Sequence, residues 1–281
     1  MASVRPRLLF VTDLAYQAKG RRYCDEDIFL TSRLRTDFDI ALCHPLDAAA
    51  LMDALAVDAI VVRNSGPVLR YQAAYDDFRD RALRRGARVC TQLTGKGDQA
   101  GKQYLLDLTA QGFPVIPTVD RPEDLGLLPD AAEYVVKPKF GADSTGLEFV
   151  TRERLRAQQY EIGPAMLVQP RIDFRYEVSF YYVDHSFQYA LYAPRPDRRW
   201  ALERYEPTAA DLDFAGRFID WNDIDHGIQR VDACRAPDGE LLLVELEDLN
   251  PYLSLDLLDD GTRDSFVASL TASLHRLLGR P

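Results

Sequence analysis

Three carboxylates near the C-terminal end of the sequence have the spacing of a metal site. Glu245 and Glu247 are two residues apart within an apolar segment, so a β-strand would project both from one face. Asp232 lies in a second apolar segment nearby, and Asn250 follows shortly after Glu247. Carboxylates in apolar strands are costly unless they are compensated, and clustered oxygen ligands suit Mg²⁺ shared with phosphates. Arg230 could neutralise one carboxylate on a solvated face, but three carboxylates outnumber this one cation, which favours a metal.

The turn between the two apolar segments predicts how these side chains face one another. An Asp-Gly pair, Asp238-Gly239, is typical of a β-hairpin. A two-residue turn at this pair would set Asp232 directly opposite Glu245, and Arg230 opposite Glu247, on one face. Opposed carboxylates repel, so without a metal this face is expected to be strained, and Glu245→Gln is expected to stabilise the metal-free chain.

A lysine followed by small residues is a second candidate, for binding phosphates. Lys137 ends the apolar segment Tyr134-Val-Val, and a loop follows whose small residues would let backbone N–H groups approach an anion. The order of residues is neither that of a Walker loop nor that of a dinucleotide fingerprint. An ordinary strand–turn–strand hairpin is the alternative. The candidate phosphate contacts in the loop are Gly141, Ala142, Ser144, Thr145 and Gly146.

Weaker candidates lie at the ends of other apolar segments. Gln169, which precedes Pro170, could present a strand edge to a base, and Glu177 could hold ribose hydroxyls. A Pro-terminated strand and a surface glutamate are the alternative.

Polar residues after the N-terminal strands are candidate substrate contacts. Arg63 and Asn64 follow an apolar strand, at the position where parallel sheets commonly bind ligands, and we assign Asp13 to the same role. Arg195 and Arg199 belong to a basic tract that could neutralise phosphates during catalysis. Plain strand-end polar residues and a solvated basic loop are the respective alternatives.

The elements that would position these residues change in type along the chain. Residues 1–92 alternate apolar strands with amphipathic helices, which predicts a parallel α/β layer. The Gly-rich segment 93–101 is interpreted as a boundary, and a helix is expected over 102–111. Residues 166–247 are rich in strands and include a helix at 208–220, and a final helix is expected over 262–278.

Composition narrows the class of protein. The chain has 281 residues and a net charge of −10, which argues against nucleic acid as a partner. No apolar run is long enough to span a membrane. Four scattered cysteines predict a reducing, cytoplasmic location. Only five lysines occur, which makes each of them informative.

Several of these pieces, in this order, resemble the ATP-grasp ligases, and within them the branch of the D-cycloserine synthetase and glutathione synthetase type of carboxylate–amine ligases. The matching pieces are Gly-Lys102 with its helix, Val-Val-Lys137-Pro, the small-residue loop, Val-Gln169-Pro, Glu177-Val-Ser179, Arg230-Val-Asp232 and Glu245-Leu-Glu247 with Pro251.

The resemblance implies roles for particular residues. Lys102 and Lys137 would bind the phosphates of ATP, and 141–146 would cover them. The strand end near Gln169 would meet adenine, and Glu177 the ribose. Asp232, Glu245 and Glu247 or Asn250 would hold Mg²⁺, with Mn²⁺ as an alternative, and Arg230, Arg195 and Arg199 would assist catalysis.

The fold that the resemblance implies is mixed α/β and α+β, with subdomains that clasp ATP. Its parts would be a Rossmann-like N-terminal domain at 1–94, a central lid at 95–170 and a C-terminal subdomain with the metal site at 171–281. The expected reaction forms an amide through an acyl phosphate, from a small, amino-acid-like carboxylate and an amine. A regulatory ATP-binding protein and a small-molecule kinase are the alternatives, and a homodimer is compatible with this reading.

Overall fold

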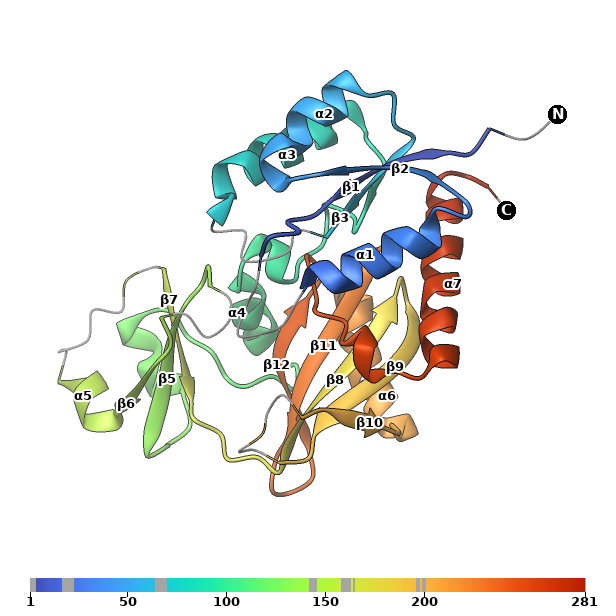
Figure 1. The fold of residues 1–281 in the computed structure, drawn as a ribbon. Helices are drawn as coiled ribbons and strands as arrows, with labels where there is room; N and C mark the ends of the chain where they lie inside the picture. Colours follow the sequence, from blue (N-terminus) through green and yellow to red (C-terminus); the bar gives the residue numbers. More distant parts are fainter. Residues whose placement is uncertain are drawn as a thin grey trace.

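Three β-sheets follow one another along the chain (Figure 1). The computed structural model describes residues 4–16, 23–63, 70–141, 146–157, 163, 165–195, 198 and 201–280. The N-terminal sheet lies at the top of Figure 1, the smallest sheet at the left, and the largest below the first.

The N-terminal sheet is parallel, as the strand–helix alternation predicted. Its strand order is β2-β1-β3-β4. These strands are β1 (Arg7–Val11), β2 (Asp39–Cys43), β3 (Ala59–Val62) and β4 (Val89–Cys90). The helices of this layer are α1 (Tyr23–Leu34), α2 (Ala48–Ala54) and α3 (Gln72–Arg85). The α2 helix was not predicted. The α3 helix ends at Gly86, which takes the left-handed conformation that ends helices.

The smallest sheet is antiparallel and carries Lys137. Its strand order is β6-β5-β7. The strands are β5 (Glu133–Pro138), β6 (Glu148–Thr151) and β7 (Met166–Pro170), and the short helix α5 (Arg152–Arg156) follows β6. This sheet has its own small apolar core, which includes Val136, Val150 and Val168.

The largest sheet is antiparallel and carries the three carboxylates. Its strand order is β10-β9-β8-β11-β12. The strands are β8 (Tyr176–Val183), β9 (Ser186–Ala193), β10 (Glu203–Tyr205), β11 (Ile228–Arg235) and β12 (Leu241–Glu247).

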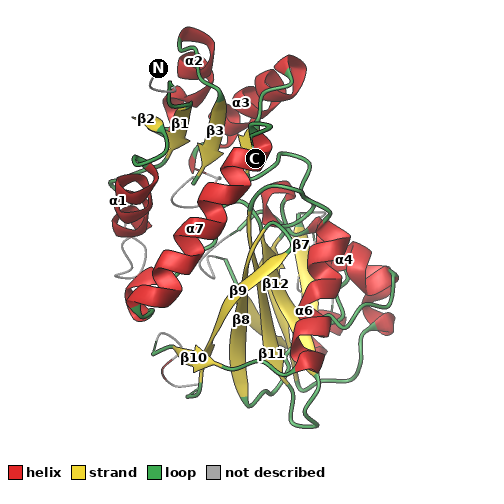
Figure 2. Cartoon of the chain, turned by 90° about the vertical axis from the view of Figure 1, so that its right-hand side faces the viewer, coloured by secondary structure: helices red, strands yellow, loops and turns green. Residues whose placement is uncertain are grey.

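Different helices cover the two faces of this sheet (Figure 2). On one face, α4 (Gln103–Ala110) and α6 (Ala209–Asn222) pack against residues such as Phe180, Val231 and Leu246. On the other face, α7 (Asp260–Leu277) packs against Tyr181 and Tyr189, in a core that also contains residues of α1 and β1. The helices predicted over 102–111, 208–220 and 262–278 are thus confirmed. No helix among the described residues is long and apolar enough to cross a membrane.

The β11–β12 hairpin differs from the predicted two-residue turn. The backbone N–H of Ala236 donates to the carbonyl of Glu240 at 2.9 Å, so three residues form the turn. A bulge then follows, because Ala233 pairs with Leu243 whereas Asp232 pairs with Glu245. The turn prediction was therefore wrong, yet the predicted pairings of Asp232 with Glu245 and of Arg230 with Glu247 are both present.

Candidate functional site

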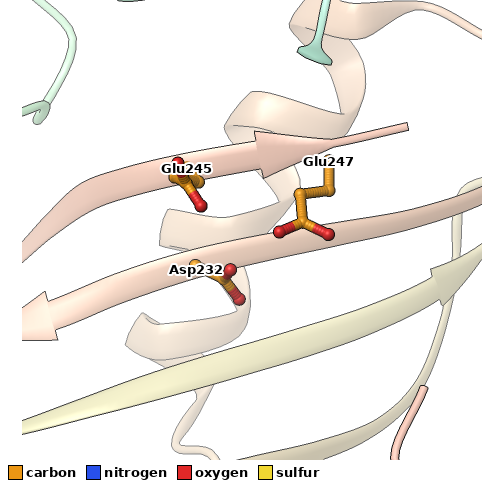
Figure 3. A group of neighbouring side chains, drawn as sticks. All are labelled: Asp232, Glu245 and Glu247. Atoms are coloured by element: carbon orange, nitrogen blue, oxygen red, sulfur yellow. The ribbon is translucent and has the colours of Figure 1, made fainter. Parts of the chain in front are cut away.

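The three carboxylates gather on the face of the largest sheet that points away from α4 and α6 (Figure 3). Asp232 projects from β11, and Glu245 and Glu247 project from the neighbouring β12. One oxygen from each side chain lies within 4.8 Å of the other two. Carboxylate oxygens at such spacing can converge on one hard divalent cation, so the donor set fits Mg²⁺.

Arg230 joins two of these carboxylates. Its guanidinium donates to Asp232 at 2.9 and 2.7 Å and to Glu247 at 2.5 Å. A further N–H donates to the carbonyl of Tyr252 at 2.8 Å. Burial acts to lower the pKa of Arg230. The attraction of the two carboxylates is stronger than this effect, so the pKa of Arg230 is raised above its usual value. Burial raises the pKa of Glu247, and Asp232 adds to this rise against the lowering effect of Arg230.

Lys102 pairs with the third carboxylate. The residue lies immediately before α4, and its ammonium group donates to Glu245. Burial opposes the charge on both groups, but their attraction outweighs it, so the pKa of Lys102 is raised and that of Glu245 is lowered. Glu245 is therefore not an uncompensated carboxylate, because Lys102 pairs with it, whereas Asp232 and Glu247 share Arg230.

Lys137 supplies a second buried lysine near Lys102. It lies on β5 opposite Leu167 and is 9% exposed. Among the described residues it has no ion-pair partner. Burial and the nearby charge of Lys102 lower the pKa of Lys137 to about 8. An anion bound beside both lysines would relieve this unfavourable burial of positive charge.

Asn250 offers one further acceptor. Its Oδ1 atom is buried and has no hydrogen-bond partner among the described residues. Buried acceptors are normally satisfied, so this oxygen is available to a ligand.

The candidates for the base and ribose lie on consecutive strands, β7 and β8, that belong to two different sheets. Gln169 is buried in β7, where its amide donates to Thr118 at 2.8 Å and to the carbonyl of Ile116 at 3.4 Å. Its side chain therefore links β7 to the segment of Ile116 and Thr118, and its backbone pairs with Val135 of β5. Glu177 is half-buried on β8, opposite Cys234 of β11.

The small-residue loop and the basic tract are only partly described. Gly141 and Gly146 flank the loop, and Gly146 has a φ of 76°, which favours glycine. Arg195 is exposed just after β9. The predicted contacts Ala142, Ser144, Thr145, Arg199 and Asn64 lie outside the described residues.

Arg63 and Asp13 occupy different environments at the N-terminal sheet. Arg63 is 2% exposed, and its guanidinium donates to Asp27 at 3.0 Å, to Glu26 at 3.2 Å and to the carbonyl of Pro251 at 2.7 Å. Through these bonds Arg63 joins α1 of the N-terminal layer to the segment after β12. Arg63 could contact a substrate only if some of these bonds broke.

Asp13 lies in a small polar cluster just after β1. It accepts hydrogen bonds from the Tyr71 hydroxyl and from the N–H of Ala15, and His44 is 3.7 Å away. Sequence reasoning missed Tyr71 and His44 because they come from separate loops. His44 directly follows β2, and this position is the signal that could have indicated it. Tyr71 directly precedes α3, where the sequence gives no such signal.

Comparisons with known proteins give relatives in both sequence and fold. No family model matches the chain. A cycloserine biosynthesis protein of Streptomyces lavendulae is 27% identical over 239 residues, which is 73% of this chain and 79% of that protein. The crystal structure of D-cycloserine synthetase matches with a TM-score of 0.73 at 22% identity, and the match covers 96% of this chain and 99% of the other.

More distant enzymes share the fold. D-alanine–D-alanine ligase of Bacillus anthracis, complexed with ATP, matches with a TM-score of 0.69 at 13% identity over 99% of this chain and 97% of that one. An ATP-grasp ligase complexed with a precursor variant, Mg and ADP matches with a TM-score of 0.65 at 15% identity over 97% and 99%. The predicted fold class is confirmed, because the chain shares its fold with these ligases, among them an ATP-grasp ligase.

Proposed function

We propose that this chain is an ATP-dependent carboxylate–amine ligase that forms an amide bond through an acyl phosphate. The observation that carries the proposal is the convergence of two buried lysines with a cluster of three carboxylates. A carboxylate must be activated before an amine can attack it, and transfer of the γ-phosphoryl group of ATP achieves this. Such a reaction needs positioning and charge neutralisation more than a protein nucleophile.

Lys102 and Lys137 would bind the phosphates of ATP. Lys102 is paired with Glu245, so phosphate binding would exchange this carboxylate for a phosphate oxygen. The exchange would leave Glu245 free to serve as a ligand together with Asp232 and Glu247. Nucleotide and metal binding would therefore depend on each other.

Asp232, Glu245 and Glu247 would hold Mg²⁺, or Mn²⁺ as an alternative, and Asn250 would be a further ligand. When bound, the metal would neutralise charge on the phosphate oxygens during transfer. Arg230 orients two of these carboxylates, Asp232 and Glu247, through its hydrogen bonds.

The other contacts with ATP are assigned to residues of β7, of β8 and of the segment after β5. The backbone near Gln169 would meet adenine, and Glu177 would hold the ribose. The segment 141–146, including Gly141, Ala142, Ser144, Thr145 and Gly146, would cover the phosphates. We propose that the chain has three parts, an N-terminal domain at 1–94, a central lid at 95–170 and a C-terminal subdomain at 171–281.

The carboxylate substrate would be small and amino-acid-like. Arg195 and Arg199 would neutralise the reacting phosphoryl group, and the substrate would lie near Asp13 and Asn64. Arg63 would act here only if its internal bonds were released.

Phosphate release tests this proposal. We expect ADP and phosphate from ATP only when a suitable carboxylate is present, in a screen of amino acids supplied singly and in pairs. Hydroxylamine should then trap a hydroxamate, because it attacks an acyl phosphate. A phosphorylated product without hydroxamate would identify a kinase instead, and nucleotide binding without turnover would identify a regulatory protein.

A further inference from the structure

The Gly-rich segment between the N-terminal sheet and α4 wraps around one buried carboxylate. Asp248, the residue after β12, is fully buried. Its carboxylate accepts hydrogen bonds from the N–H of Gly97 at 3.0 Å and from the N–H and the side-chain amide of Gln99 at 3.0 and 3.1 Å. A Cβ at Gly95 would lie 2.2 Å from an oxygen of Asp248, and one at Gly97 2.8 Å from its Cγ. The glycines thus permit the backbone to approach this side chain.

Asp98 completes the contact in the opposite direction. One oxygen of Asp98, Oδ1, accepts hydrogen bonds from the N–H of Asp248 at 2.7 Å and from that of Leu249 at 2.9 Å. Each aspartate therefore binds the backbone of the segment that carries the other. We call this reciprocal arrangement of Asp98 and Asp248 the aspartate clasp.

Asn222 extends the clasp to the strand that carries Arg230. Its side-chain NH₂ group donates to Asp248 at 3.0 Å and to the side chain of Gln229 at 2.9 Å. Its side-chain oxygen accepts from the backbone N–H of Lys96 at 2.5 Å. Asn222 and Gln229 are both fully buried. The Gly-rich segment is thereby bonded to the beginning of β11 as well as to the end of β12.

The clasp joins two parts of the candidate site. Lys102 follows Asp98 by four residues, and Glu247 immediately precedes Asp248. The phosphate-binding lysine and the metal-binding strand come from distant parts of the sequence, so a fixed contact between their backbones sets their separation. Groups that orient ligands in this way commonly influence affinity without touching the ligand.

We propose that Asp98 and Asp248 are positioning residues that hold Lys102 in register with the carboxylates of β12, so that MgATP meets both in one geometry. This inference rests on the proposed function. It predicts that breaking the clasp weakens nucleotide binding in a folded chain.

Two substitutions that replace a carboxyl group by an amide separate this role from general electrostatics. Asp98→Asn keeps Oδ1 as an acceptor for both backbone N–H groups, and its new amide can donate to Asp248. In Asp248, three N–H groups donate to Oδ2 and a fourth donates to Oδ1. Asp248→Asn replaces one of these oxygens by an NH₂ group, which would face at least one of these donors and could not accept from it. Asp98→Ala removes both acceptor bonds and serves as the disruptive partner of Asp98→Asn.

The experiment measures binding of a non-hydrolysable ATP analogue with Mg²⁺ by calorimetry, at a temperature where circular dichroism shows every variant folded. We expect Asp248→Asn and Asp98→Ala to weaken binding by about 10- to 100-fold, and Asp98→Asn to bind close to the wild-type chain. If Asp248→Asn does not fold, the comparison of Asp98→Ala with Asp98→Asn decides alone.

Equal binding by the wild-type chain and all folded variants would overturn the clasp as a positioning device. Equal weakening by Asp98→Asn and Asp98→Ala would also overturn it, because charge rather than the acceptor geometry would then matter. No binding by the wild-type chain would instead overturn the proposed function, and this inference with it.

Discussion

Replacing Lys137 by methionine should stabilise the nucleotide-free chain while it weakens ATP binding. Lys137 is buried without an ion-pair partner among the described residues, and burial together with Lys102 lowers its pKa from the usual 10.5 to about 8. A residue that is unfavourable for the fold and adjacent to a second cation fits a role in binding an anion. Methionine keeps an unbranched apolar chain and removes the charge.

The pKa shift sets the size of the effect. Each pKa unit corresponds to about 1.4 kcal/mol, so burial of charged Lys137 costs on the order of 3 kcal/mol near pH 7. Because the folded chain binds this proton less tightly than the unfolded chain, stability rises with pH between about 8 and 10.5. The advantage of Lys137→Met should therefore be largest below about pH 8 and should fade as the pH approaches 10.5.

Urea denaturation near pH 7 and near pH 10 measures this difference, and calorimetry with an ATP analogue measures binding. The matched control is Lys139→Met, because Lys139 donates to Asp120 at 2.6 Å and to Gln103 at 3.4 Å. The control should lose stability or keep it, but should not gain it. A Lys137→Met chain that is no more stable than wild type near pH 7, or whose advantage does not depend on pH, would refute this reasoning. Unchanged nucleotide binding would remove Lys137 from the site.

Three further substitutions test other parts of the site. Glu245→Gln should abolish ADP release and, in EDTA, lower the melting temperature, because Lys102 would be buried without its partner; a higher melting temperature would contradict the pairing. Arg63→Met should lower the free energy of unfolding in urea by about 3–5 kcal/mol, since it leaves buried carboxylates uncompensated; a small effect would argue that these groups are solvated. Asp232→Asn should remove the rise in melting temperature that Mg²⁺ gives with an ATP analogue, and an undiminished rise would place the metal elsewhere.

The layer architecture could be predicted because it depends on local patterns. Uninterrupted apolar segments separated by amphipathic helices predicted the parallel N-terminal sheet, and the structure has it. Short elements such as α2, with seven residues, and β10, with three, carry too little periodicity to stand out.

The ion pairs of the site could not be predicted in the same way. The sequence indicated that Asp232, Glu245 and Glu247 share a face, because alternation along strands is local. It did not indicate that Lys102 neutralises Glu245, since this contact joins residues 143 positions apart. The sequence alone predicted that Glu245→Gln would stabilise the metal-free chain. Because of this one tertiary contact, we expect the substitution to destabilise it.

The β11–β12 hairpin shows why a wrong turn can accompany a correct site. A three-residue turn alone would have put Asp232 and Glu245 on opposite faces, but the bulge at Val244 restores the pairing. Leu243 and Leu246 both pack in the core, and a spacing of three between core residues on one strand requires such an extra residue. Burial of these leucines excludes the carboxylates from the same face, because charged groups there would lack compensation. The hydrophobic pattern therefore determines the face on which the three carboxylates lie, and the bulge adjusts the turn to it.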